Sequence, residues 1–280
     1  MPVWATFSWI WWEGVRILGK ALGFLKRDFL IEVSYRFNFL LSLAGIFFSA
    51  SIFYFLGKIV DPAVVQDTAN DYFSFVLVGM AFAMFLRTGL GSFAESMREE
   101  QMMGTLEAML ATPTSLSLII LSSSLWRFLL TSISVVVYLL IGAAFGISFA
   151  GANIPVALLL LILTVLAYSA LGIISASFII IFKRGDPINW VVSTVSIFLG
   201  GVLYPISVLP GWLRFFSRIL PITYSLEGIR GTLLKAQGIS DVTTDLIALA
   251  VISVVLIPLS LALFSLAVNH ARRTGTLVKY

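Results

Sequence analysis

Residues 154–182 read IPVALLLLILTVLAYSALGIISASFIIIF and contain no charged side chain. A helix crosses the hydrocarbon core of a bilayer with about 20 mostly apolar residues, so this segment is long enough to span a membrane. Across the 280 residues of the chain, 59% are hydrophobic and only 11% are charged. A soluble domain of this length needs far more charge to cover its surface, so we expect an integral membrane protein.

Five other apolar stretches are also long enough to cross a membrane, as judged from the length of each apolar run. We therefore predict an all-α polytopic membrane protein with a six-span transmembrane domain at 37–268. An N-terminal segment, 1–36, precedes this domain, and a tail, 269–280, follows it. The six predicted spans cover residues 37–57, 72–93, 125–149, 154–182, 188–209 and 246–268.

The basic residues predict how the chain is oriented. Short loops rich in Lys and Arg stay on the cytoplasmic side of a membrane, and an even number of spans places both termini on one side. We therefore expect a multi-pass protein of the cell (inner or plasma) membrane with both termini in the cytoplasm. The side that holds the termini carries Arg16, Lys20, Lys26, Arg27, Arg36, Arg98, Lys183, Arg184, Arg272, Arg273 and Lys279, and the other side carries Lys58, Arg214, Arg218, Arg230 and Lys235.

The segment before the first span has the pattern of an amphipathic helix. Apolar residues recur every three or four positions from Val15 to Phe29, and Arg16, Lys20 and Arg27 project from the opposite side. A narrow apolar stripe with basic residues opposite predicts a helix that lies in the membrane interface. The alternative is a soluble helix that packs on a partner protein.

Catalytic chemistry is not expected in this chain. Residues 14–21, GVRILGKA, resemble a phosphate-binding loop, but Ala21 occupies the position where Ser or Thr binds magnesium, and no strand precedes the match. There is no Cys and only one His, His270, so we predict no metal site and no enzyme activity. The net charge of +4 is too modest to indicate nucleic-acid binding.

Two ionisable side chains fall well inside predicted spans, Arg87 and Arg127. Both lie toward the expected cytoplasmic ends of their spans. We interpret them as side chains that reach the headgroups or that pair locally, with Glu95 as the candidate partner. Contact with a substrate is the alternative.

An acidic connector, ESMREEQMMGTLEAMLATP at residues 95–113, follows the second span. Met103, Leu106 and Leu110 share one helical face, whereas most of the glutamates lie away from it. We predict an exposed cytoplasmic helix at about 97–113 that ends before Pro113. Charge patterning alone leaves two interpretations open, a solvated acidic loop and a docking helix for a cytoplasmic protein.

A proline-rich segment follows the fifth predicted span. Pro205, Pro210 and Pro221 interrupt helical continuity, and the pieces between them are too short to cross a bilayer. This pattern predicts re-entrant half-helices at about 210–236, and an amphipathic surface loop is the alternative. Arg230 follows Glu227 by three residues, so we expect these two side chains to pair in a structural role.

These two segments together resemble the membrane (permease) subunit of type 2 ABC exporters. EEQMMGTLEAMLATP at 99–113 is similar to the family segment after the second span, and LYPISVLPGWLRFFSRILPITYSLEGIRGTLL at 203–234 is similar to the one before the last span. In that family the first segment is the coupling helix, which sits in a groove of the ATPase subunit. The resemblance implies a coupling role for Glu99, Glu100, Gly104, Thr105, Leu106, Glu107, Leu110 and Pro113, and an outer gate or re-entrant element built from Tyr204, Pro205, Pro210, Trp212, Arg214, Arg218, Pro221 and Arg230.

The resemblance also implies a function. The chain is expected to be one half of a permease that pairs with a second copy, contacts membrane lipids and docks two copies of a separate ATPase. ATP and Mg would bind in that ATPase, and this chain would bind no cofactor. LPITY at 220–224 resembles the drug and lipid branch, which implies export of an amphiphilic drug, lipid or glycolipid. The alternatives are a polysaccharide exporter subunit and a non-transporting scaffold or assembly factor that recruits a cytoplasmic partner.

Small residues offer one further clue to helix packing. Gly142 and Gly146 are spaced like a helix-packing motif, and Gly172 and Ala176 form a looser pair. Such pairs let helices approach closely, either within one subunit or between two copies. Because Gly is common in membrane helices, we favour packing within one subunit.

Overall fold

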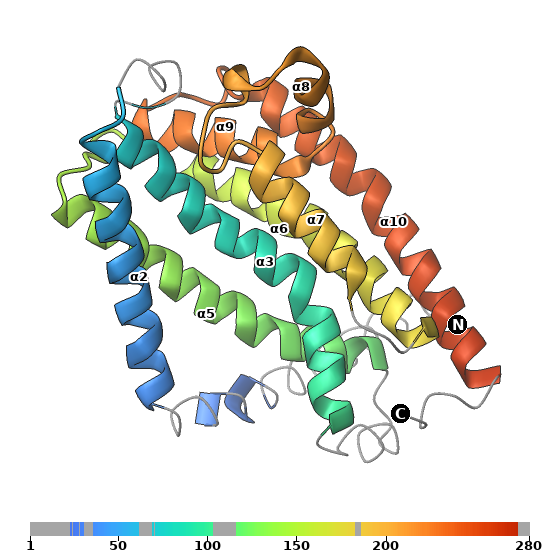
Figure 1. The fold of residues 1–280 in the computed structure, drawn as a ribbon. Helices are drawn as coiled ribbons and strands as arrows, with labels where there is room; N and C mark the ends of the chain where they lie inside the picture. Colours follow the sequence, from blue (N-terminus) through green and yellow to red (C-terminus); the bar gives the residue numbers. More distant parts are fainter. Residues whose placement is uncertain are drawn as a thin grey trace, which may run out of the picture.

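The computed structural model describes residues 23, 25–27, 29–30, 36–61, 69, 71–102, 116–182 and 186–273. Over these residues the regular secondary structure is entirely helical. Figure 1 shows long helices that lie side by side, with the short helices α8 and α9 at one end of the bundle. The C-terminal ends of α3 and α10 lie at the opposite end.

Five helices in the described ranges have the length and composition needed to cross a membrane. Their apolar windows correspond to five of the six predicted spans, so the expected class, an all-α polytopic membrane protein, is confirmed. The helices are α2 (Arg36–Gly57), α3 (Tyr72–Met102), α5 (Leu116–Ala144), α6 (Ile154–Phe182) and α10 (Thr243–Arg273).

The fifth predicted span, 188–209, is a short apolar helix followed by a break and not one unbroken helix. Helix α7 (Pro187–Leu199) has 13 residues, about 20 Å of helix, which is shorter than the roughly 30 Å hydrocarbon core. It begins after Asp186, whose side chain accepts a hydrogen bond of 2.9 Å from the Asn189 amide. It ends at Gly200, and the next residue, Gly201, has a φ of +76°, a conformation that favours glycine.

The prolines start the elements that follow α7 and do not break α7 itself. Proline fixes its own φ and lacks an amide proton, so it suits the first position of a helix, where that proton has no partner within the helix. Pro221 takes that place, whereas Pro205 and Pro210 are the N-cap residues directly before their helices. Pro205 precedes the 3-10 helix η2 (Ile206–Val208), Pro210 precedes α8 (Gly211–Ser217), and Pro221 is the first residue of α9 (Pro221–Leu234).

Helix α3 is the central helix of the bundle. It packs against α2, α5, α6, α7 and α9, and 78% of its apolar window is buried, compared with 11% for α2 and 17% for α10. Close approach to α6 depends on Gly172, where an added Cβ would lie 2.1 Å from the Gly89 carbonyl oxygen. The position of α3 is therefore fixed by contacts along most of its length.

Of the spaced glycines Gly142 and Gly146, Gly142 packs within one subunit, as we favoured from the sequence. A Cβ added at Gly142 would lie 2.8 Å from the side chain of Leu77 on α3. Gly146 lies beyond the end of α5 and has a φ of +103°, so it serves a turn and does not share a helix face with Gly142. Neither residue supports a contact between two copies.

Candidate functional site

One face of α3 carries polar side chains along the C-terminal half of the helix. Arg87, Glu95 and Arg98 are exposed and are spaced by eight and three residues, which places them on the same side of the helix. Thr88 lies beside them and is partly buried. Because the rest of this helix is largely covered, we refer to these four residues as the polar face of α3.

Helices α5 and α7 flank the polar face. Thr88 and Glu95 both contact side chains of α5. On the other flank, the Asn189 side chain of α7 lies 3.3 Å from the point where a Cβ would stand on Gly91. Gly91 lies between Arg87 and Glu95 on this side of the helix and is buried, so α7 approaches the middle of the polar face while Arg87 and Glu95 stay exposed.

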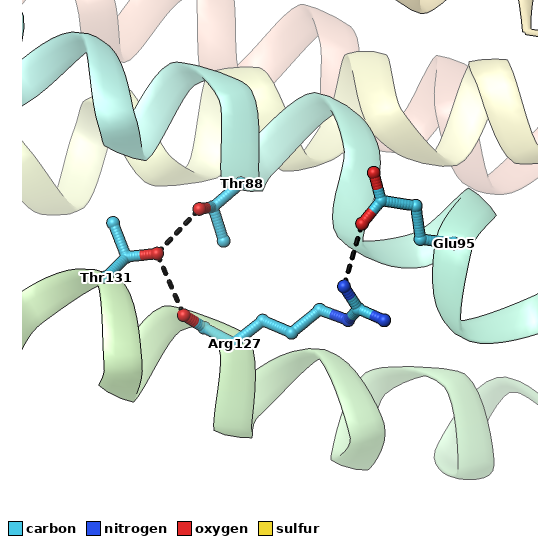
Figure 2. A network of polar contacts seen from close by, with 4 residues as sticks. All are labelled: Thr88, Glu95, Arg127 and Thr131. Carbon is cyan, nitrogen blue, oxygen red and sulfur yellow. Dashed lines mark hydrogen bonds and ion pairs between the residues drawn. The ribbon is translucent and has the colours of Figure 1, made fainter. Parts of the chain in front are cut away.

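An ion pair joins α3 to α5 at the polar face (Figure 2). Arg127 Nη1 lies 2.7 Å from Glu95 Oε2, and the side chains of Arg127 and Glu95 are 27% and 60% exposed, respectively. The local pairing of Arg127 with Glu95 that we favoured from the sequence is confirmed. Both charges are thereby compensated within the chain.

Two threonines make a second connection between the same helices. The hydroxyl oxygens of Thr88 and Thr131 are 2.6 Å apart, and the Thr131 hydroxyl donates to the Arg127 carbonyl oxygen at 2.9 Å. Because the Thr131 proton is used in that bond, Thr88 must be the donor to Thr131. The Thr88 hydroxyl, the Thr131 hydroxyl and the Arg127 carbonyl thus form a directed chain of hydrogen bonds, drawn in Figure 2.

Arg87 differs from Arg127 in its surroundings. It is the middle residue of the 31-residue helix α3 and is exposed. No ion pair to Arg87 occurs within the described ranges of the chain. Arg87 is therefore a cation of the polar face that has no ion pair among the described residues and that lies inside the apolar window of α3.

The predicted coupling residues lie at and beyond the C-terminal end of α3. Glu99 and Glu100 belong to its last turns, and their side chains lie outside the described part of the structure. The other predicted coupling residues also lie outside the described residues, so their role stays a prediction. These residues are Gly104, Thr105, Leu106, Glu107, Leu110 and Pro113.

At the other end of the bundle, Arg230 of α9 is buried with 2% of its surface exposed. Its Nε donates to the Phe75 carbonyl oxygen at 3.1 Å, and its Nη1 and Nη2 donate to the carbonyl oxygens of Gly201 and Val202 at 2.8 and 3.0 Å. The guanidinium also lies over the Phe75 ring, 3.5 Å from its centre. One side chain therefore joins α9, α3 and the break after α7.

The guanidinium of Arg230 binds these carbonyl groups and does not form the expected ion pair with Glu227. No direct ion pair joins the two side chains in the described chain, although their charges attract each other over a longer distance. Burial lowers the pKa of Arg230 to about 9, so the guanidinium stays protonated at neutral pH, and burial raises the pKa of the Glu227 carboxyl. The structural role that we expected for Arg230 holds, with different partners.

The broken end of α7 has its carbonyl groups satisfied by side chains. The Tyr204 hydroxyl donates to the Phe198 carbonyl oxygen, and the Ser217 hydroxyl donates to that of Leu199. The Tyr168 hydroxyl of α6 accepts from the Ile222 amide at the start of α9, at 3.2 Å. An interrupted span needs such partners because unpaired backbone groups are unfavourable in the membrane.

The remaining residues of the predicted outer gate occupy different environments. Arg214 donates through Nη2 to the carbonyl oxygens of Ser207 and Leu209, so its guanidinium holds the turn before α8. Arg218 is exposed, and its carbonyl oxygen accepts from the Tyr224 hydroxyl at 2.7 Å. Trp212 is 69% exposed. Of the two arginines of α8 in the predicted gate, Arg214 is thus engaged with the backbone.

Sequence reasoning missed the polar face of α3 as a unit. The signal was present, because Arg87, Glu95 and Arg98 recur at helical spacing in a segment that we treated only as a span and its connector. The Thr88–Thr131 pair gave no comparable signal, since isolated threonines are common in membrane helices and these two are 43 positions apart.

Comparison with known proteins places this architecture among transporters. The family model described as ABC-2 type transporter matches residues 24–234. ABC transporter G family member 20 of Dictyostelium discoideum is 24% identical over 183 residues, which cover 65% of this chain and 25% of that protein. Inner membrane transport permease YadH of Escherichia coli (strain K12) is 24% identical over 195 residues, which cover 69% of this chain and 75% of YadH. The chain thus matches only about a quarter of the length of the Dictyostelium relative.

Proposed function

The chain belongs to the ABC-2 type transporter family, and from this membership we propose that it is the permease subunit of an ATP-driven exporter. The family places it among the membrane subunits of ABC transporters. Our proposal adds that it moves an amphiphilic drug, lipid or glycolipid out of the cytoplasm or the inner leaflet. ATP hydrolysis would occur in a separate ATPase subunit.

The observation that carries this proposal is the continuity of α3. Its 31 residues correspond to roughly 46 Å of helix. Near one end, Phe75 contacts Arg230, the middle holds the polar face, and the other end leads directly into the predicted coupling segment. A displacement of the coupling segment would therefore act on a single buried helix, and the far end of that helix contacts α9 through Arg230.

The proposed cycle follows from this arrangement. Two ATPase subunits close on ATP and Mg and push the coupling segments of two permease copies. Helix α3 moves with its coupling segment and changes the contact between Arg230 and the break after α7. Tyr204 and Trp212, which lie at that break and on α8, would then open the pathway outward.

The surfaces around α3 support an amphiphilic substrate. The polar face presents charged groups, whereas α2 exposes large apolar side chains such as Phe48 and Phe55, at 66% and 63% exposure. The polar head of an amphiphile would match the charged groups of the polar face, and its tail would lie among the apolar side chains of the membrane. The uncovered apolar side of α2 also supports pairing with a second copy of the chain.

The proposed orientation has a direct test, because the chain contains no native cysteine. Arg98→Cys and Arg218→Cys replace exposed residues at the two ends of the bundle. A membrane-impermeant maleimide added to intact cells should label the residue-218 variant, and should label the residue-98 variant only after the cells are opened. Labelling of the residue-218 variant from the cytoplasmic side alone would reject the orientation and the outer gate.

The function is tested with the purified permease and a soluble ABC ATPase encoded near it in the genome. We expect the two proteins to co-purify, and we expect proteoliposomes of the complex to move a fluorescent phospholipid between leaflets only when ATP is hydrolysed. A Walker-lysine variant of the ATPase is the matched control. ATPase binding without movement of any amphiphile would reject the transport proposal and favour a scaffold role.

A further inference from the structure

The two arginines in spanning helices are in opposite electrostatic situations. Arg127 is compensated by Glu95 at 2.7 Å, whereas Arg87 is exposed and takes part in no ion pair among the residues described. Both belong to helices that qualify as membrane spans. An uncompensated cation in a span is rare and needs a polar environment or a counter-ion.

The depth of Arg87 argues against contact with the headgroups. The apolar window of α3 covers Tyr72–Ser96, so Arg87 lies nine residues, about 14 Å of helix, from its nearer end. Arginine side chains that reach the interface start close to the ends of a span. A cation at this distance from the end of the apolar window is favoured by a water-filled pathway or by another polar group beside it.

We propose that Arg87 binds the anionic headgroup of the transported amphiphile on the polar face of α3. The inference rests on the proposed function and deepens it, because it names the substrate class as anionic amphiphiles. A guanidinium donates up to five hydrogen bonds and matches phosphate or carboxylate oxygens in two-point contacts. No other described group of the chain competes for these donors by an ion pair.

The neighbours of Arg87 fit both parts of such a ligand. Met84 and Met80 lie one and two turns away on the same face and are half-buried, and their flexible side chains adapt to an apolar tail. Glu95 lies two turns away in the other direction, and its charge is already compensated by Arg127. The pair therefore leaves the attraction of Arg87 for an anion largely intact.

The competing explanation is a second copy of the chain whose carboxylate faces Arg87. The two explanations predict different effects when the charge of Arg87 is removed. If Arg87 binds a substrate, Arg87→Gln weakens binding of the anionic ligand and leaves the dimer intact. If Arg87 pairs with a second copy, the same variant weakens the dimer.

The experiment compares the wild type, Arg87→Gln, Arg87→Lys and the control Lys58→Gln. The control removes one exposed cation that lies over the Tyr54 ring, away from the polar face. Each variant is reconstituted with the ATPase, and ATP-dependent movement is measured for fluorescent phosphatidylglycerol and fluorescent phosphatidylcholine. Binding of the same two lipids to the detergent-solubilised permease is measured by native mass spectrometry, and the oligomeric state by light scattering.

We expect Arg87→Gln to reduce phosphatidylglycerol movement and binding by about tenfold or more, the size expected from one charge-assisted hydrogen bond. Movement and binding of phosphatidylcholine should change by less than about twofold, a difference too small to represent a lost charged contact. Arg87→Lys should retain most of the preference for the anionic lipid, and Lys58→Gln should behave like the wild type.

Three results would overturn the inference: equal losses for both lipids, unchanged phosphatidylglycerol binding in Arg87→Gln, or dissociation of the dimer in that variant. A failure of the proposed function is distinguishable from these. If the wild type moves neither lipid with ATP, the transport proposal fails, while the native mass spectra still decide whether Arg87 selects anionic lipid.

Discussion

Arg230 contacts Phe75 in two ways, with its Nε 3.1 Å from the carbonyl oxygen and its guanidinium 3.5 Å from the centre of the ring. The two residues are 155 positions apart. One residue of α3 thus offers both its backbone and its side chain to a single buried cation of α9. Together with the bonds to Gly201 and Val202, this contact fixes α9 and the break after α7 to the central helix.

Arg230→Ala is expected to lower the free energy of unfolding by about 3 kcal/mol or more, because it removes three hydrogen bonds to carbonyl groups and the contact with the Phe75 ring. Thermal unfolding in detergent, followed by tryptophan fluorescence, measures the change. Arg218→Ala is the matched control, since Arg218 is exposed. Equal melting temperatures for the two variants would contradict the structural role of Arg230.

Gly79→Ala should destabilise the protein at the same place. An added Cβ would lie 2.3 Å from the Val202 carbonyl oxygen and 2.4 Å from Arg230 Nη2, which forces the contact apart. Gly45→Ala in α2 is the control, because no atom lies within 4 Å of its added Cβ. We expect the Gly79 variant to melt several degrees lower than wild type, as a loss of about 1–3 kcal/mol implies, and the Gly45 variant to match or exceed wild type.

The Glu95–Arg127 pair should contribute little to stability. With 60% and 27% exposure of the two side chains, a double-mutant cycle with Glu95→Gln and Arg127→Gln should give a coupling of about 0.2–1 kcal/mol. Thermal melting of the wild type, both single variants and the double variant supplies the four values. A coupling well above this range would show that the pair is desolvated in the assembled protein.

Tyr204→Phe is expected to loosen the outer gate and to raise ATP hydrolysis in the absence of substrate. The change removes the hydrogen bond to the Phe198 carbonyl oxygen and keeps the ring, which packs edge-on against Phe198. Tyr204→Ala, which also removes the ring, should raise hydrolysis further. Tyr54→Phe in α2 is the control for loss of a tyrosine hydroxyl, and equal hydrolysis in all variants would argue against a gate at Tyr204.

Reversal of the predicted coupling charges should separate ATP hydrolysis from export. If Glu100 and Glu107 face the ATPase, as the family resemblance implies, Glu100→Lys with Glu107→Lys should release the partner, since losing one side of a desolvated charge contact costs about 2–5 kcal/mol. Co-purification and transport assays measure the effect, and membrane insertion should be unchanged. Normal ATPase binding by the double variant would remove these residues from the interface.

The spans were predictable because the information for a membrane helix is local. A run of about 20 apolar residues is visible in the sequence, and α6 begins and ends where its apolar run does. The early end of the helix in the fifth predicted span depends on a contact outside any local window. Gly200 ends α7 where the chain meets α9, and a Cβ there would lie 2.1 Å from the side chain of Ile222.

A contact of the candidate site was predictable from the sequence only where both partners are charged side chains. Glu95 was a visible partner for Arg127, because few carboxylates occur near spans. Glu227 was the natural local partner for Arg230, but the carbonyl groups that bind it come from α3 and from the break after α7. Backbone carbonyls carry no sequence signature, so a buried arginine that uses them is recognised only from the folded chain.

The shortness of α7 has a consequence for biosynthesis. A helix of about 20 Å does not carry enough apolar length to hold its own ends across the hydrocarbon. Its broken end is completed by Tyr204 and Ser217, and Arg230 adds the contact to α3, all from residues that the ribosome makes later. It follows that α7 reaches its final depth only after α9 has been synthesised and has packed against α3. The order in which the helices are made therefore differs from the order in which they settle in the membrane.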